Sequence, residues 1–191
     1  MKIIAFTGAG ISKQSNIPTF MERPDIRDRL HRSFAQRHPE EYNQTIAELK
    51  AGMANAEPNP AHYALAQYNI PVITMNIDGL HTKAGSKKVL ELHGGLPEDN
   101  EMDHASTLHN KPVLYGDPAP NYERAFDWVS NLDANDIFIV VGCSYHTAIA
   151  NDLRHIAQRM GCRIYEIQED AAHQLPALLE RLIAENPDLT K

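Results

Sequence analysis

Short, wholly apolar runs alternate along this chain with longer segments in which apolar residues recur at every third or fourth position. Short apolar runs bounded by glycine or polar residues are typical of strands buried on both faces of a parallel sheet. On this basis the sequence predicts strands at 3–6, 71–77, 88–94, 111–116, 136–142 and 162–167.

The segments with helical periodicity lie between these strands. They predict helices at about 24–36, 39–52, 60–68, 122–132, 147–160 and 170–185. Strands separated by helices form a parallel sheet covered on both faces, so we expect an α/β fold with a doubly wound parallel sheet. In such sheets ligands bind beyond the carboxyl ends of the strands.

Several residues with distinctive chemistry directly follow the predicted strands. They are Gly8 and Gly10 after the first strand, Asn76 and Asp78 after the second, His93 at the end of the third, Gly116 after the fourth, Gly142 and Ser144 after the fifth and Gln168 after the last. Because the carboxyl ends of parallel strands meet at one edge of the sheet, we expect these residues to gather there.

The composition is that of one globular domain. With 191 residues, 42% of them hydrophobic and 23% charged, the chain is long enough to bury a sizeable core. No apolar stretch approaches the roughly 20 residues that cross a bilayer, and the first residues do not read as a secretion signal. We therefore expect a soluble, cytoplasmic protein with no membrane partner.

Charge and cysteine content argue against two further classes. A formal net charge of −7 argues against general nucleic-acid binding, which requires an excess of lysine and arginine. With Cys143 and Cys162 as the only cysteines, a disulfide framework is not expected, and a four-cysteine zinc site is impossible within one chain.

The first glycines lie in the stretch "GAGISKQSNIPTF", which departs from the common dinucleotide-binding fingerprint. Lys13 occupies the position of the third glycine of that fingerprint. Glycines let the backbone pass close to another group. Taken alone, the stretch fits either a nucleotide-binding loop or a tight turn that connects a strand to a helix.

Five motifs together carry a resemblance to a known family. The motifs "GAGISKQSNIPTF", "NPAHYAL", "TMNIDGLHTKAG", "LELHG" and "VVGCS" occur in the order, and near the spacing, of the sirtuin family of NAD-dependent protein deacylases. The resemblance extends from the first strand through Gln168. It implies a Rossmann-like NAD-binding catalytic domain, for which we expect residues 1–191 to form a single unit.

The resemblance assigns most of the candidate residues to NAD. It implies a cofactor-binding set of Gly8, Ala9, Gly10, Ser12 and Phe20 in the first motif, Asn76 and Asp78 around nicotinamide and its ribose, and Gly142, Cys143, Ser144 and Gln168 around the adenosine half. Partial positive charge at a helix N-terminus would suit the pyrophosphate. At Cys143, a buried small residue is expected rather than a reactive thiol.

The catalytic residues implied by the resemblance are His93, Asn76 and Asp78. Histidine suits a base because its ordinary pKa of about 6.5 lets it accept a proton at neutral pH. Fixed dipoles and a carboxylate stabilise the positive charge that develops when the nicotinamide–ribose bond breaks. From the residues alone, Asn76 and Asp78 could instead only cap a turn before Gly79.

The segment "KPVLYGDPAP" resembles the one along which sirtuins bind an extended acyl-lysine peptide through backbone hydrogen bonds. Tyr115, Gly116 and Asp117 are then the substrate-binding residues. An ordinary strand followed by a proline-rich turn explains the same segment.

Residues 97–110 depart from the family, because they contain no cysteine where most sirtuins carry a small zinc lobe. We expect a short, solvated loop in place of that lobe. Asp103, His104 and His109 could contact a metal ion, but their spacing fits no standard zinc site, and no metal is expected.

Two further departures concern nicotinamide recognition. Thr19 and Met21 replace an acid and an arginine of the family pattern, and Met75 replaces a glutamine. NAD binding should survive these changes. The properties they affect are the rate, the acyl preference and the requirement for an acyl substrate.

The resemblance therefore favours an NAD-dependent protein-lysine deacylase that releases nicotinamide and O-acyl-ADP-ribose. One alternative is NAD cleavage without a peptide, by an NAD glycohydrolase or ADP-ribosyltransferase. A further alternative is a non-catalytic sensor of NAD or ADP-ribose. The sequence leaves the physiological substrate, the acyl chain and the oligomeric state undetermined.

Overall fold

The computed structural model describes residues 1–17 and 22–187, and these form one parallel sheet of five strands. The strands are β1 (Ile3–Thr7), β2 (Val72–Thr74), β3 (Val89–Glu91), β4 (Ile137–Val141) and β5 (Arg163–Ile167). Their order in the sheet is β3-β2-β1-β4-β5, and every neighbouring pair is parallel. The predicted α/β fold with a doubly wound sheet is confirmed.

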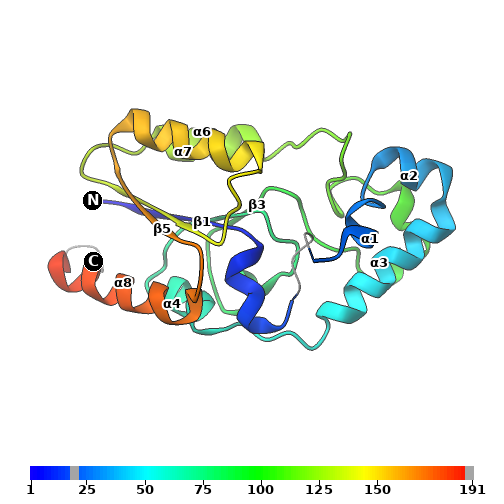
Figure 1. Ribbon diagram of the computed structural model, residues 1–191, viewed down its shortest axis with the longest axis horizontal. Coiled ribbons are helices and arrows are strands. Elements are labelled where there is room, and N and C mark those ends of the chain that lie inside the picture. The colour runs from blue at the N-terminus through cyan, green and yellow to red at the C-terminus, as the bar shows by residue number, and fades with distance from the viewer. Residues whose placement is uncertain (18–21, 188–191) are drawn as a thin grey trace.

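Helices cover both faces of the sheet (Figure 1). Helices α4 (Pro60–Gln67) and α8 (Ala171–Glu185) lie on one face, and α6 (Tyr122–Ser130) and α7 (Ala148–Met160) lie on the other. Successive residues of a strand point to opposite faces. Accordingly Ile3 and Ala5 of β1 pack with α4 and α8, whereas Ile4 and Phe6 pack with α6 and α7. We call this layered unit the sheet body.

A second hydrophobic cluster lies beside the sheet body, at the right of Figure 1. It is built by α1 (Pro24–Arg27), α2 (Arg32–Arg37), α3 (Pro39–Met53) and the 3₁₀ helix η2 (Asp99–Thr107). Tyr42 and Ile46 of α3 pack there with Ala105 of η2. We call this unit the helical lobe. Two short elements complete the chain, the 3₁₀ helix η1 (Ala9–Ser15) and α5 (Leu80–Lys83).

The predicted short, solvated loop at 97–110 is mostly exposed, but it contains a 3₁₀ helix. Residues 99–107 form η2, and Ala105 is fully buried against the helical lobe. The backbone N–H of Ser106 also donates to the side chain of Asn43 on α3, at 2.8 Å. The buried alanine and the bond to Asn43 thus help to hold this polar segment on α3.

The predicted strand at 111–116 and the predicted helix at 24–36 were also wrong, and for one reason. The backbone of Tyr115 bonds to the chain between α1 and α2, with its N–H donating to Leu30 and its C=O accepting from Arg32, at 3.0 and 2.9 Å. This pairing draws the chain around His31 into an extended conformation and separates α1 from α2. It also uses the groups with which Tyr115 would have joined the sheet.

The glycines after β1 are explained by a contact between two parts of the chain. The N–H of Gly10 donates to the C=O of Gly142 at 3.1 Å, and a Cβ at Gly10 would lie 2.5 Å from the Cα of Gly142. A Cβ at Gly8 would lie 2.6 Å from the carbonyl oxygen of Gly142. These glycines therefore allow the chain after β1 to pack closely against the loop after β4.

Two buried histidines lie between β1 and its neighbouring helices. His81 of α5 is within 2.9 Å of the Thr7 hydroxyl at the end of β1, and its ring centroid lies 4.9 Å from that of His62 on α4. Burial lowers the pKa of His62 to about 4 and that of His81 to about 3. Both imidazoles are therefore neutral in the folded protein at pH 7.

No helix in the described ranges combines the length and apolar character needed to span a membrane.

The close contact between Gly10 and Gly142 predicts that Gly10→Ala destabilises the protein. The added methyl group meets main-chain atoms of Gly142, which yield only by a backbone shift, so we expect a loss of about 1–3 kcal/mol in the free energy of unfolding. Urea unfolding would measure it. Gly52→Ala is the matched control, because its Cβ meets nothing within 4 Å, and it should leave the stability unchanged or raised. Equal effects of the two variants would contradict the explanation.

The buried histidines predict that stability falls on acidification. Their pKa values are lower in the folded than in the unfolded chain, so stability is lost as the pH falls below about 6.5 toward 4. Between pH 7 and pH 5 each histidine should contribute about 2 kcal/mol to this loss.

Urea unfolding at both pH values tests this. His81→Leu should reduce the difference between the two pH values, whereas His155→Leu on the exposed face of α7 should not. An undiminished pH dependence in His81→Leu would show that His81 titrates normally in the folded state.

Candidate active site

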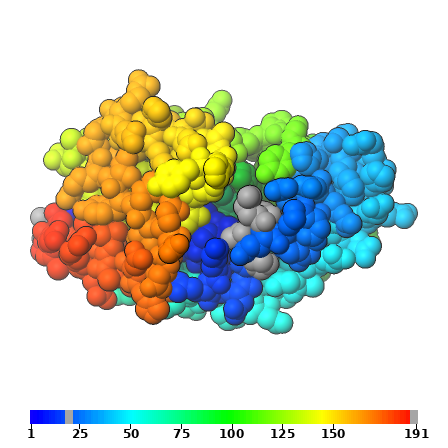
Figure 2. Space-filling view, viewed as in Figure 1, coloured from blue at the N-terminus to red at the C-terminus, as the bar shows by residue number. Residues whose placement is uncertain are grey.

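The loops after β1, β2, β3 and β4 meet at the carboxyl edge of the sheet, where it adjoins the helical lobe. The chain order of the strands reverses at β1, which pairs with β2 on one side and with β4 on the other. In open α/β sheets such a reversal is the usual place for a ligand. Figure 2 shows the surface hollowed between the sheet body and the helical lobe.

Ser12 of η1 connects three of the sequence motifs. Its hydroxyl donates to Asp78 Oδ2 at 2.6 Å and accepts from Asn76 Nδ2 at 3.1 Å. The Nε2 atom of His62 lies 3.5 Å from the same hydroxyl. His62 Nδ1 accepts from the backbone N–H of Asn59, so the ring proton of neutral His62 is on Nε2 and faces Ser12.

Asp78 caps a turn, as one of its two interpretations predicted. Its Oδ1 atom accepts from the backbone N–H of Leu80 at 3.0 Å, directly after Gly79 with its φ of 69°. The other carboxylate oxygen faces Ser12. The turn therefore fixes the carboxylate in place, and its second oxygen is directed into the cluster with Ser12 and Asn76.

His93 lies beside this cluster, because its Nδ1 atom is 3.0 Å from the C=O of Met75, the residue that precedes Asn76. A carbonyl only accepts, so Nδ1 carries the proton in the neutral ring. The Nε2 atom lies 2.9 Å from the hydroxyl of Tyr122. Burial lowers the pKa of His93, partly offset by the hydrogen bond to Met75, so Nε2 presents a lone pair at neutral pH.

Glu91 is a second carboxylate at this edge, which the sequence analysis did not single out. It is the last residue of β3, and burial together with the nearby charge of Asp78 raises its pKa. Its position two residues before His93 was the available signal, because residues i and i+2 of an extended chain share one side.

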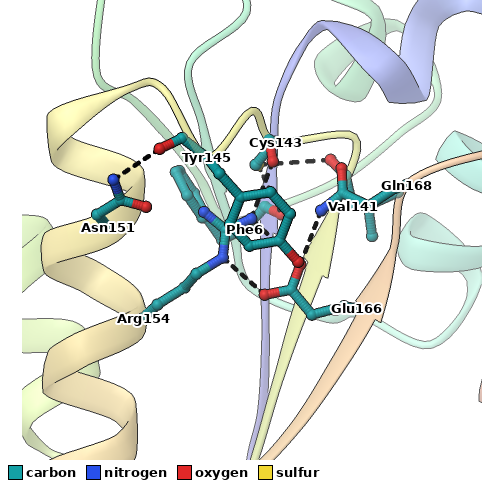
Figure 3. Close-up of polar contacts among 8 residues, drawn as sticks. All are labelled: Phe6, Val141, Cys143, Tyr145, Asn151, Arg154, Glu166 and Gln168. Carbon is teal, nitrogen blue, oxygen red and sulfur yellow. Dashed lines mark hydrogen bonds and ion pairs between the residues drawn. The ribbon is translucent and has the colours of Figure 1, made fainter.

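Cys143 and Gln168, assigned to the adenosine half, lie around an ion pair between the buried Arg154 of α7 and the exposed Glu166 of β5 (Figure 3). Arg154 Nε donates to Glu166 Oε1 at 2.6 Å, and Arg154 Nη2 donates to the C=O of Cys143 at 2.9 Å. The Tyr145 hydroxyl and the Gln168 amide donate to the other oxygen of Glu166, at 3.2 and 2.7 Å. Gln168 and the Cys143 main chain are thus held by one carboxylate and one guanidinium.

The side chains of Cys143 and Ser144 differ in character. Cys143 is fully buried, its Sγ lies near the C=O groups of Phe6 and Val141, and burial raises the pKa of its thiol. It is the buried small residue that we expected. Ser144 is exposed, and its hydroxyl accepts from the backbone N–H of His146 at 3.1 Å.

Some of the backbone N–H groups of the first loop that could bind a phosphate are already bonded within the protein. The N–H of Gly10 is bonded to Gly142, and that of Ile11 to the C=O of Gly8. Ala9, Gly10 and Ser12 themselves belong to η1, a 3₁₀ helix of seven residues. A helix this short contributes little dipole field, so the expected contribution of a helix N-terminus is not supported.

In the predicted substrate segment, the side chain of Asp117 is buried and Tyr115 is exposed. Asp117 is buried in a bidentate ion pair with Arg32, with both N···O distances at 2.7 Å, and this pair lowers the pKa of the carboxyl. Arg32 also donates to the C=O groups of Ser106 and Leu108. The Asp117 side chain therefore joins the segment to the helical lobe. Tyr115 remains 60% exposed, with its ring stacked on His31.

Some sequence predictions lie outside the described residues. Thr19, Phe20 and Met21 belong to this group. In the parts of the chain that are described, no three or more His, Cys, Asp or Glu side chains are grouped to hold a metal ion. His104 and His109 are both exposed residues at or near η2.

Sequence reasoning missed Tyr122, Arg154 and Glu166, which lie on helices and a strand well apart in the chain. No local motif marks such residues, since only the packing of α6 and α7 brings them to the site. The one available signal was an aromatic residue at the first position of a predicted helix, close to the carboxyl edge.

Comparisons with known proteins agree with this geometry. Residues 8–108 match the model of the Sir2 family. The chain is 34% identical over 197 residues to NAD-dependent protein deacylase 2 of Archaeoglobus fulgidus, covering 84% of this chain and 77% of that relative.

Solved structures give the same result. The fold is similar to that of a Sir2 homologue in complex with NAD, with a TM-score of 0.79, 25% identity and coverage of 96% and 90% of the two chains. It is also similar to a Sir2 protein in complex with the inhibitor EX-527, 2′-O-acetyl-ADP-ribose and a deacetylated p53 peptide, with a TM-score of 0.75, 28% identity and coverage of 97% and 94%. The chain belongs to the Sir2 family.

Proposed function

We propose that this protein is an NAD-dependent protein-lysine deacylase. It would transfer the acyl group of an acylated lysine to ADP-ribose and release nicotinamide. The observation that carries the proposal is the joining of Ser12, Asn76 and Asp78 by hydrogen bonds beside His93, at the strand reversal of the sheet. The A. fulgidus relative is named a deacylase, and one similar structure holds 2′-O-acetyl-ADP-ribose.

The donor set at this edge fits NAD, which the reaction consumes and which supplies the ADP-ribosyl acceptor. An amide, a hydroxyl and a carboxylate stand together at Asn76, Ser12 and Asp78, matching the amide and hydroxyl groups of nicotinamide riboside. Gln168 and the main chain at 142–144 would hold the adenosine half.

The protein groups have separate tasks in the two stages of the reaction. In the first stage, the Asp78 carboxylate and the Asn76 amide stabilise positive charge at the anomeric carbon of the ribose. In the second stage, His93 takes up the proton of the ribose hydroxyl that captures the acyl group. The neutral Nε2 lone pair of His93 is suited to this task at pH 7.

The partner is expected to be an acyl-lysine peptide, and we place it beside residues 113–116. The main chain of Tyr115 is bonded to Leu30 and Arg32, so the peptide would use other backbone groups of the segment together with the exposed Tyr115 ring. We also expect the protein to act in the cytoplasm, and its net charge of −7 does not favour nucleic acid as a partner.

The role of His93 predicts that O-acyl-ADP-ribose forms from NAD and an acyl-peptide and that His93→Ala lowers kcat by about 10²- to 10⁴-fold, the usual contribution of a general base. Mass spectrometry with peptides bearing acyl chains of several lengths would measure the product. The control His155→Ala, on the exposed face of α7, should keep the wild-type rate.

Two outcomes would contradict the proposal. The absence of O-acyl-ADP-ribose with every acyl-peptide would exclude deacylation. Nicotinamide release at an undiminished rate without any peptide would instead indicate an NAD glycohydrolase.

The hydrogen bonds of Ser12 predict that Ser12→Ala weakens NAD binding. The variant leaves Asp78 and Asn76 without this partner, at a cost of about 1.5 kcal/mol, so the KM for NAD should rise about tenfold. Steady-state kinetics at saturating peptide would test it. Ser33→Ala on the exposed side of α2 is the control. An unchanged KM for NAD would remove Ser12 from the NAD site.

A further inference from the structure

Tyr122 is fixed firmly at the Nε2 atom of His93. It is the first residue of α6, and its side chain packs against the hydrophobic cluster shared by the sheet and α7. The preceding Asn121 donates from Nδ2 to the C=O of Glu91 at 2.7 Å, which ties the start of α6 to the end of β3. The Tyr122 hydroxyl is 2.9 Å from Nε2.

The hydrogen bonds of His93 leave no second acceptor on the ring. Nδ1 carries its proton toward the C=O of Met75, and Nε2 has a single lone pair in the ring plane. The Tyr122 hydroxyl donates to that lone pair. A ribose hydroxyl therefore cannot donate directly to Nε2 while Tyr122 is in place.

We propose that Tyr122 is a further catalytic residue, which relays the proton from the ribose hydroxyl to His93. The ribose O–H bond breaks and its proton passes to Tyr122 Oη, while the proton of Tyr122 passes to His93 Nε2. The electron pair left on the ribose oxygen forms the new bond to the acyl carbon, and the pair of the C=N double bond at that carbon, formed when the acyl oxygen bonded to the ribose, moves onto the lysine nitrogen. Tyr122 ends the step as a neutral phenol, and His93 ends it as an imidazolium. This inference rests on the proposed deacylase function.

Two features favour a relay over displacement of Tyr122 by the substrate. Moving the hydroxyl away would break the packing of the ring on the hydrophobic cluster, since residues 121 and 122 belong to a helix start that is bonded to β3. In addition, burial and the neighbouring Tyr115 raise the pKa of Tyr122. The phenol is therefore protonated before the step and has a proton to pass to His93.

Tyr122→Phe tests the relay, because it keeps the ring and removes only the hydroxyl. We expect kcat for O-acyl-ADP-ribose formation to fall about 10²-fold or more, with little change in KM for NAD and peptide. Exchange of labelled nicotinamide into NAD in the presence of acyl-peptide should persist, because bond cleavage at the anomeric carbon precedes the step that needs the base. Persistent exchange also shows that the variant is folded.

Tyr122→Met gives a second test with an unbranched apolar side chain and should show the same separation of the two activities. Tyr68→Phe, which removes the hydroxyl of a half-buried tyrosine after α4, is the control and should behave as wild type. A wild-type or higher kcat in Tyr122→Phe, or an equal loss of exchange and product formation in both variants, would overturn the relay. A wild-type protein without any acyl transfer would refute the deacylase function itself.

Discussion

The contact between the main chains of Gly10 and Gly142 is the constraint on which the site depends. It brings the loop after β1 against the loop after β4, with the Gly10 N–H bonded to the Gly142 carbonyl. Ser12 follows Gly10 by two residues, and its side chain bonds to Asn76 and Asp78, which lie in the loop after β2. Without this contact, the loop after β1 would not lie between the loop after β2 and the loop after β4. The strand order reverses at β1, and the glycines let the loops after β1 and β4 pack against each other at that point.

Burial determines the protonation states at this edge. His62, His81 and His93 all have lowered pKa values, because each is withdrawn from water. The neutral imidazoles of His62 and His93, whose hydrogen bonds define their tautomers, act as fixed donors and acceptors, which orient their neighbours without adding charge. The proposed adenosine side differs, since Arg154 and Glu166 form an ion pair there. The proposed reacting end thus combines neutral imidazoles with the Asp78 carboxylate, whereas an ion pair lies at the proposed adenosine end.

The sequence was sufficient where one segment decides the outcome. The apolar run at 136–142 could only be a buried strand, and β4 covers Ile137–Val141. The residues that follow β1, β2, β3 and β4 lie at the expected edge because parallel strands all end there, but Gly116 follows no strand of the sheet. The sequence was insufficient where two distant segments decide together. The break at His31 depends on the backbone of Tyr115, and the position of Tyr122 depends on how α6 is tied to β3. The burial of Ala105 likewise required knowledge of its partner on α3.

The segment before the Arg32–Asp117 ion pair has a mechanical consequence. The N–H of Val113 donates to the main-chain carbonyl of His93 at 2.9 Å, while Tyr115 is bonded to the chain on either side of His31. The short stretch from Val113 to Tyr115 therefore links the backbone of His93, the proposed base, to the helical lobe. A peptide that adds hydrogen bonds along this stretch would stiffen the link, so part of its binding energy would be spent on orienting the imidazole. A peptide hydrogen bond lost along this stretch would then slow the acyl transfer as well as weaken peptide binding.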